Sequence, residues 1–166
     1  MQPTGRELTD GWLITLGRME KTSRSFEVET AAFPAVDSYL ADRIYEFNVE
    51  ATQLPDAKEF ALVVRDKSQE VIAGISGHRW GGTCHINHLW VHQEHRKSGL
   101  GTALIKEAEA EARKAKCSQV LLSSHSFQAP GFYEKMGYHL VAVITDYPNG
   151  HSNQHFMKIL YTSDAA

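Results

Sequence analysis

Apolar residues between positions 36 and 54 recur at steps of three and four, which is typical of an amphipathic helix: Val36, Leu40, Ile44, Phe47, Ala51 and Leu54. Two β-rich runs follow at residues 60–64 and 71–75, and the polar turn between them predicts a hairpin. After the Gly81-Gly82 turn, a third antiparallel strand is expected over residues 84–91. The first half of the chain therefore predicts a helix and then a three-stranded meander.

The hydrophobic period changes again after Gly99, where apolar residues recur on one face as far as Ala115 and charged residues fill the other face. This pattern predicts a long helix, on which Glu109 and Arg113 can pair. A buried strand is expected at residues 120–122, a short helix from Pro130 to just before Gly137, and strands over 138–145 and 154–161. Because a strand, helix, strand order favours a parallel pair, these elements predict a mixed α/β or α+β sheet with helices on its faces.

The length of 166 residues fits one domain, which we expect over residues 25–161. Residues 1–24 are interpreted as an N-terminal extension of unassigned role, in which residues 12–16 can form a short strand, and residues 162–166 as a tail. The net charge of -3 argues against nucleic-acid binding. Apolar runs of only about five residues argue against a membrane span, which needs roughly 20. With no signal-peptide pattern and only two cysteines, a cytoplasmic location is expected.

Histidine is over-represented, since five of the nine histidines lie between residues 78 and 95. His88, His92 and His95 have a spacing that suits a metal site on a helix, but this segment is predicted to be a strand that runs into a loop. No cysteine or carboxylate completes a ligand set, so no metal is expected. Cys84 is not favoured as an acyl nucleophile, because nothing in the sequence stabilises its thiolate.

The segment after Val91 joins the predicted third strand to the long helix through a basic turn that contains glycine. Helix N-termini offer unpaired N–H groups and a partial positive charge, which suit a pyrophosphate, and Arg96 and Lys97 add full charges. The segment does not fit other nucleotide loops, because no lysine follows Gly101 and the three-glycine dinucleotide fingerprint is incomplete. From the residues alone, a simple glycine-rich helix start stays open.

The run Arg96-Lys97-Ser98-Gly99-Leu100-Gly101 resembles the [Gln/Arg]-x-x-Gly-x-[Gly/Ala] motif of the GNAT superfamily of acyl-CoA-dependent N-acetyltransferases. Phe132 to Tyr138 resembles the Phe-Tyr-x-x-x-Gly-[Tyr/Phe] element of the same family, and the strand at residues 88–92 also matches. The resemblance covers about residues 25–161. It implies an α/β (α+β) fold with a mixed, largely antiparallel, splayed sheet of six to seven strands and helices on both faces.

The resemblance also implies acetyl-CoA as the co-substrate. The backbone of Leu89, Trp90 and Val91 is then expected to pair with the pantetheine arm in the manner of an added strand. The pyrophosphate is expected to bind to the amides and side chains of Arg96, Lys97, Ser98, Gly99, Leu100, Gly101 and Thr102.

For catalysis, the resemblance places Tyr133 at the position of the family's usual general acid, and simple aromatic packing is the alternative. His85 is similar in position to a base histidine of the arylalkylamine acetyltransferases, and an imidazole is a suitable base near neutral pH. His88 is a second candidate, and a water chain without a unique base also stays open. Strand alternation predicts that His85, Asn87, Leu89 and Val91 share one face, opposite Cys84, Ile86, His88 and Trp90.

The acceptor site of the family forms between the first helices, the splay of the sheet and the loop joining the last two strands. By resemblance, the substrate-binding candidates are Glu46, Asn87, Ser124, Tyr147 and His151, although Tyr147 and His151 also fit an ordinary hairpin tip. The expected function is acetyl transfer from acetyl-CoA directly to a primary amine of a small molecule. A peptide or protein amine is the alternative acceptor, and a non-catalytic acyl-CoA-binding module is the alternative to an enzyme. A homodimer is compatible with the sequence.

Overall fold

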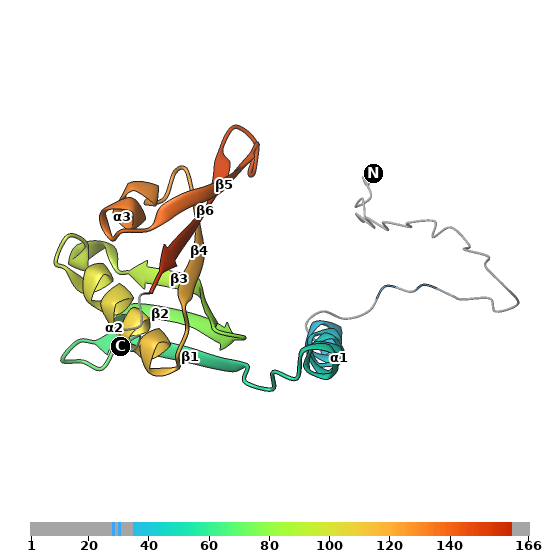
Figure 1. Cartoon of the computed structure of the whole chain (residues 1–166). Helices are drawn as coiled ribbons and strands as arrows, with labels where there is room; N and C mark the ends of the chain where they lie inside the picture. Colours follow the sequence, from blue (N-terminus) through green and yellow to red (C-terminus); the bar gives the residue numbers. More distant parts are fainter. Residues whose placement is uncertain (1–27, 29, 31–34, 161–166) are drawn as a thin grey trace, which may run out of the picture. The chain divides into compact units, whose positions relative to one another are not determined.

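The computed structural model describes residues 28, 30 and 35–160. The chain divides into two compact units, Met1–Phe47 and Asn48–Ala166, and each is described by itself (Figure 1). The expected N-terminal extension, its short strand and the expected tail lie outside the described residues. The first unit contains most of helix α1 (Ala35–Thr52), which confirms the predicted amphipathic helix. Within α1, the Arg43 guanidinium lies 2.5 Å from Glu46 and 5.4 Å from the centre of the Tyr39 ring.

The second unit is built on one six-stranded sheet of order β1-β2-β3-β4-β6-β5. Only the pair β3 and β4 is parallel, as the sequence predicted, and the other four pairs are antiparallel. The mixed, largely antiparallel sheet expected from the sequence is therefore confirmed. The strands are β1 (Lys58–Arg65), β2 (Val71–Trp80), β3 (Thr83–Val91), β4 (Gln119–His125), β5 (His139–Thr145) and β6 (Ser152–Ile159).

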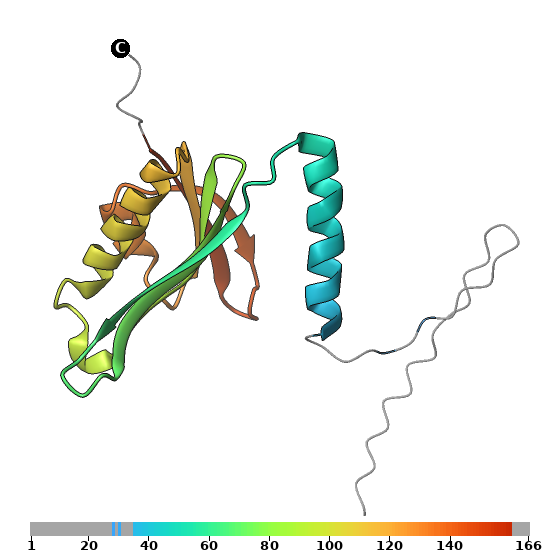
Figure 2. The ribbon, with the colours of Figure 1, turned by 90° about the horizontal axis from the view of Figure 1, so that it is seen from below.

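Helices α2 (Leu100–Lys114) and α3 (Pro130–Lys135) both lie on one face of this sheet (Figures 1 and 2). A 3-10 turn, η1 (Gln93–His95), precedes α2. The apolar face of α2 is buried through Leu104, Ile105, Ala108 and Ala112, the spacing that predicted the helix. Its partners in the core include Ala73, Ile75, Cys84, Ile86, Val120, Leu122 and Phe156.

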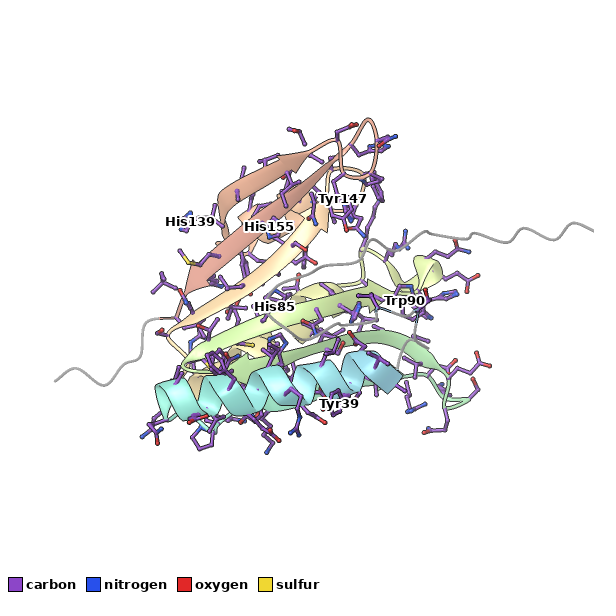
Figure 3. The ribbon with its side chains drawn as sticks, turned by 90° about the vertical axis from the view of Figure 1, so that its right-hand side faces the viewer. Tyr39, His85, Trp90, His139, Tyr147 and His155 are labelled. Carbon is purple, nitrogen blue, oxygen red and sulfur yellow. The ribbon has the colours of Figure 1, made fainter. Side chains whose placement is uncertain are left out.

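Strands β3 and β4 share only a short ladder before they diverge. Their register runs from Thr83 opposite Gln119 to Ile86 opposite Leu122, and no later residue of β3 pairs with a residue of β4. β3 continues to Val91 on β2, and β4 continues to His125 on β6. Figure 3 looks onto the face of the sheet opposite α2 and shows the two strands separating toward the end marked by Trp90 and Tyr147. This splay was expected from the family resemblance.

A β-bulge in β3 corrects the predicted alternation. Gly77 pairs with Ile86, but Ser76 pairs with His88, so Asn87 is an extra residue in the ladder. The bulge reverses the side-chain parity of the rest of the strand. Leu89 and Val91 therefore pack on the core with Cys84 and Ile86, whereas His85, His88 and Trp90 share the opposite face. The prediction that His85 and His88 lie on opposite faces was wrong.

A buried ion pair connects α2 to β6. The Lys158 ammonium lies 2.8 and 2.9 Å from the two carboxylate oxygens of Glu109, which is only 4% exposed. The same ammonium donates to the Met136 carbonyl at 2.8 Å, just after α3. Arg113 lies 3.5 Å from Glu109, as the helical spacing predicted. These contacts join α2, β6 and the end of α3 at one point.

Candidate active site

The segment between β3 and α2 forms an open cradle of backbone amides. Lys97 and Gly99 both have left-handed backbone, with φ of 64° and 94°, and α2 begins at the next residue. Consecutive turns of this kind point successive N–H groups toward one side and form an anion-binding nest. Because the first amides of a helix have no intrahelical acceptor, they add donors at the same place. A side chain at Gly99 would meet no atom within 4 Å, so the cradle is open to a ligand.

The side chains of this segment hold its shape. Arg96 Nε donates to the Val91 carbonyl at 3.2 Å, which ties the loop to the end of β3 and leaves the terminal guanidinium nitrogens available. The Ser98 hydroxyl donates to the His95 carbonyl at 2.5 Å. His92 Nδ1 accepts from the Glu94 amide at 3.4 Å. Ser98 and His92 therefore have structural partners within the loop.

The two sequence motifs meet in space. The Phe132 ring of α3 lies 3.6 Å from the position that a side chain at Gly101 would take at the start of α2. This contact places α3 beside the amide cradle. The loop also begins at the end of β3, whose edge toward β4 has no ladder partner on β4 from Asn87 to Val91, because the parallel ladder stops at Ile86. A free strand edge can accept an extended ligand arm through backbone hydrogen bonds, although the Val91 carbonyl already accepts from Arg96.

Tyr133 lies on α3 among other aromatic rings and is 8% exposed. The centres of the Phe132, Tyr138 and Phe156 rings lie 5.1, 6.0 and 6.0 Å from the centre of its ring. Burial raises the pKa of the Tyr133 hydroxyl above its usual value, because the phenolate would lose its hydration. At neutral pH Tyr133 is therefore a proton donor, as a general acid must be.

His85 and His88 lie on the face of β3 that points away from α2 (Figure 3). His85 Nδ1 lies 2.8 Å from Asn87 Oδ1, and its ring centre is 5.2 Å from that of His78 on β2. His88 Nδ1 lies 3.2 Å from the Ser76 hydroxyl. An amide oxygen can only accept, so His85 donates from Nδ1 and its Nε2 keeps a lone pair. This arrangement gives His85 the tautomer that a general base at Nε2 requires.

The expected acceptor residues fall into different places. Tyr147 and His151 lie on the loop between β5 and β6, where they contact the rings of His125 and Phe127. Ser124 is 3% exposed on the core face of β4, and its hydroxyl accepts from the Ala129 amide at 3.4 Å. Ser124 therefore has a structural partner within the chain. Glu46 lies on α1 in the first unit, where it pairs with Arg43.

The remaining chemistry of the region is limited. Within residues 35–160 no group of three or more potential metal ligands comes together. Cys84 and Cys117 are free and buried. Burial raises the pKa of the Cys84 thiol to about 11, so its thiolate is strongly disfavoured at neutral pH. A covalent acyl intermediate on Cys84 is inconsistent with this environment.

Comparison with known proteins decides what this arrangement represents. Residues 23–138 match the model of the Acetyltransferase (GNAT) family. The chain belongs to this family. GNAT acetyltransferases use acetyl-CoA as co-substrate, and the amide cradle and the free edge of β3 are the parts of this chain that fit its pyrophosphate and its extended arm. The segment from Leu89 to Thr102, which the sequence singled out, overlaps the free edge and includes the cradle.

Individual GNAT relatives agree with the fold. The chain is 41% identical over 92 residues to a blasticidin-S acetyltransferase of Streptomyces morookaense, and the match covers 55% of this chain and 68% of the relative. A crystal structure of an acetyltransferase from Bacillus cereus superposes with a TM-score of 0.71 at 32% identity, over 81% of this chain and 98% of that one. A Bacillus anthracis structure in complex with acetyl coenzyme A shares the fold, with a TM-score of 0.55 at 17% identity over 62% and 63% of the two chains. In the part of this GNAT chain that is described, no helix is long and apolar enough to cross a membrane.

Two features of this GNAT site were not predicted. The hydrogen bond between His85 and Asn87 was not predicted, although alternation had placed both residues on one face. Phe127 was not singled out from the sequence. It is a large apolar residue in a polar loop after a strand, and an exposed apolar side chain in such a place is the signal that can identify a binding residue.

Proposed function

We propose that this protein is an N-acetyltransferase that transfers the acetyl group of acetyl-CoA directly to a primary amine of a small molecule. The observation that carries the proposal is the splay of β3 and β4 beside the amide cradle, with His85 in the short paired segment of β3 from which the splay opens and Tyr133 on the helix α3 that follows β4. A small-molecule acceptor is supported by the name of the blasticidin-S acetyltransferase relative. The two free cysteines fit a reducing compartment, so we also propose a cytoplasmic location.

In the proposed reaction, bound acetyl-CoA supplies an activated thioester. The amides of the cradle and Arg96 bind the pyrophosphate, and the free edge of β3 orients the arm along the splay. Holding both reactants together lowers the entropic part of the barrier, so a covalent enzyme intermediate is unnecessary. This direct route agrees with the raised pKa of the buried Cys84 thiol.

Two side chains carry out the proposed proton transfers. His85 accepts the proton of the attacking amine at Nε2, and Asn87 holds Nδ1–H in the matching tautomer. Tyr133 keeps its hydroxyl proton at neutral pH and donates it to the leaving sulfur. His88 is the less suitable base, because its Nδ1 contacts the Ser76 hydroxyl, which both donates and accepts and so does not fix one tautomer.

Thiol release from acetyl-CoA over a panel of amines tests this function. The panel contains polyamines, aryl amines, aminoglycosides, amino acids and peptides, and we expect acetylation of at least one non-peptide amine. Acetylation of peptides alone would favour the alternative acceptor class. Tight acetyl-CoA binding without turnover over the whole panel would identify a non-catalytic binding module.

The co-substrate site is tested separately by calorimetric titration of acetyl-CoA. We expect Gly99→Glu to weaken binding by at least about tenfold, because a carboxylate would occupy the nest and repel the pyrophosphate. Gly82→Glu is the matched control, since Gly82 also has a positive φ and a side chain there would likewise meet no atom within 4 Å. Equal affinities of the two variants would contradict the proposed pyrophosphate site.

A further inference from the structure

We propose that the amine acceptor carries a planar ring, which stacks on an exposed aromatic cluster formed by His125, Phe127, Tyr147 and His151. The inference rests on the proposed acetyltransferase function and specifies its substrate class. The cluster joins two segments that are far apart in the sequence, the end of β4 with its following loop and the loop between β5 and β6. None of these four residues belongs to the hydrophobic core cluster of the described residues.

The rings contact one another in series. His125 and Phe127 are stacked almost parallel, with an interplanar angle of 2° and ring centres 5.2 Å apart. Tyr147 meets His125 edge-on at 5.4 Å, and His151 meets Phe127 edge-on at 4.9 Å. The cluster therefore combines one parallel pair of rings with two edge-on contacts.

Exposure distinguishes this cluster from a small core. Phe127 is 56% exposed and Tyr147 is 54% exposed, so more than half of each residue faces solvent. Burial of these rings therefore adds little to the stability of the free protein. Aromatic surface that stays exposed on a soluble fold is typical of a binding site.

The cluster is held in place before a ligand arrives. The Ser126 amide donates to the Ser152 carbonyl at 2.8 Å, and the Ser152 amide donates to the Ser126 hydroxyl at 3.2 Å, which joins the two loops. His125 Nδ1 lies 3.2 Å from the Tyr147 carbonyl. Within the second loop, the Gly150 amide donates to the Asp146 carboxylate at 2.7 Å. Such bracing reduces the entropy that a ligand would otherwise have to overcome on binding.

The cluster lies at the open end of the splay. His125 follows the last residue of β4 that pairs with β3, Leu122, by three positions, so it belongs to the arm that has separated from β3. Figure 3 shows Tyr147 at this end of the β4 arm and His85 on the facing strand. His125 lies four residues beyond Leu121, the partner of His85, so the cluster begins about 13 Å from His85 along the strand direction. An acceptor that places its amine at His85 and its ring on the cluster therefore needs a spacer of several atoms between them. Stacking of a flat ring on aromatic side chains contributes roughly 5- to 100-fold in affinity.

A matched pair of acceptors tests the inference. The amines 4-phenylbutylamine and 4-cyclohexylbutylamine both carry a primary amine four methylenes from a six-membered ring, but only the first ring is planar. We measure kcat/KM for each and take the planar-to-puckered ratio. In the double variant Phe127→Leu/Tyr147→Leu we expect this ratio to fall at least fivefold, because leucine keeps apolar bulk but removes the flat surface. Val143→Leu, an exposed change on β5 of the same arm, should leave the ratio unchanged.

The outcomes separate this inference from the proposed function. If the double variant keeps the wild-type ratio, the planar-ring inference is overturned whatever the rate of acetylation. If it raises KM for acetyl-CoA and leaves the ratio unchanged, the cluster serves the co-substrate and the inference is also overturned. If neither amine is acetylated, saturation-transfer NMR of the two amines still compares their binding to wild type and variant. Thermal unfolding tests whether the double variant is folded. If it is not folded, the single variant Phe127→Leu is used in its place.

Discussion

Tyr133 and Tyr138 are neighbouring buried tyrosines with different partners. Their ring centres are 6.0 Å apart, and burial raises the pKa of both hydroxyls. Tyr138 lies close to the carboxylate of Glu109, which raises the pKa of its hydroxyl further, and the Lys158 ammonium lies 5.4 Å from the centre of its ring. Tyr138 therefore belongs to the structural ion pair, and Tyr133 alone is assigned to proton donation.

This assignment predicts different effects of removing the two hydroxyls. Tyr133→Phe keeps the ring packing, so we expect kcat to fall by about 100-fold while the calorimetric affinity for acetyl-CoA stays within about twofold. Tyr138→Phe is the matched control and should keep most of the turnover. Because the pKa of Tyr133 is raised, the alkaline decline of wild-type kcat should begin above the ordinary tyrosine value of about 10. Parallel losses of turnover and affinity in Tyr133→Phe would instead indicate a packing role.

The histidines on β2 and β3 provide a second test at the level of single residues. His85→Ala should remove the acidic limb of the pH dependence of kcat/KM and lower the value at pH 7 by about 100-fold, because the base at Nε2 is lost. His78→Ala removes the neighbouring ring, 5.2 Å away, and serves as the control with an unchanged profile. An acidic limb that persists in His85→Ala but disappears in His88→Ala would transfer the base role to His88.

Single residues were predictable from the sequence where a motif requires a particular backbone conformation. Gly99 and Gly101 were recognised because they match the family motif at a predicted helix start, and the structure shows Gly99 at φ 94°. The aromatic cluster was only half predicted, since Tyr147 and His151 were singled out as candidates and Phe127 was not. The contacts that bring Phe127 to His151 depend on how two loops close, and this information is not contained in either loop by itself.

Among the elements, β3 shows what alternation can and cannot predict. Its position and its parallel pairing with β4 followed from periodicity and from the intervening helix, and the boundaries of α2 agree within one residue with the pattern. The bulge at Asn87 was missed because the alternation of side chains between the two faces of a sheet holds only while the strand is regular. The physical signal for it is Gly77 on the neighbouring strand, where a side chain would lie only 2.1 Å from the His85 carbonyl.

This close approach predicts the effect of adding one methyl group to β2. Gly77→Ala should lower the free energy of unfolding by about 3 kcal/mol, because the backbone of β3 must move away from its partner. It should also lower kcat, since the displaced residue is His85. Gly74→Ala is the matched control on the same strand, where the nearest backbone atom would be 3.3 Å away and a smaller loss is expected. Denaturant titration of both variants measures the difference, and equal losses would contradict the role of Gly77.

For the whole molecule, four buried groups make stability sensitive to alkaline pH. Burial raises the pKa of the Cys84, Cys117, Tyr133 and Tyr138 side chains in the folded chain. In the unfolded chain, cysteine and tyrosine ionise near their ordinary values of about 8.5 and 10. Between those values and the raised ones, the unfolded state has lost protons that the folded state keeps, so stability falls as pH rises.

We therefore expect the free energy of unfolding to be constant near pH 7 and to decrease above about pH 9. Each group that ionises only in the unfolded state contributes a slope of about 1.4 kcal/mol per pH unit. Cys84→Ala should reduce this slope between about pH 9 and 11 by nearly the contribution of one ionising group, whatever the effect of the substitution on the free energy of unfolding at pH 7. Urea titrations at pH 7, 9 and 10.5 measure the slope, and a slope identical to that of wild type would contradict the buried-thiol interpretation.

The short ladder between β3 and β4 has a consequence for the order in which the sheet is assembled. The hairpins β1–β2, β2–β3 and β5–β6 connect strands that follow one another in the chain, whereas Thr83 and Gln119, which also share a side-chain hydrogen bond, are 36 residues apart. Closing this long loop costs entropy that only four residue pairs and the packing of α2 repay. The two halves of the sheet thus have local contacts of their own, and their junction is the late, non-local step of folding. The splay that we propose as the place of the thioester exists only once that junction has formed, so partly folded chains would lack the proposed reaction site.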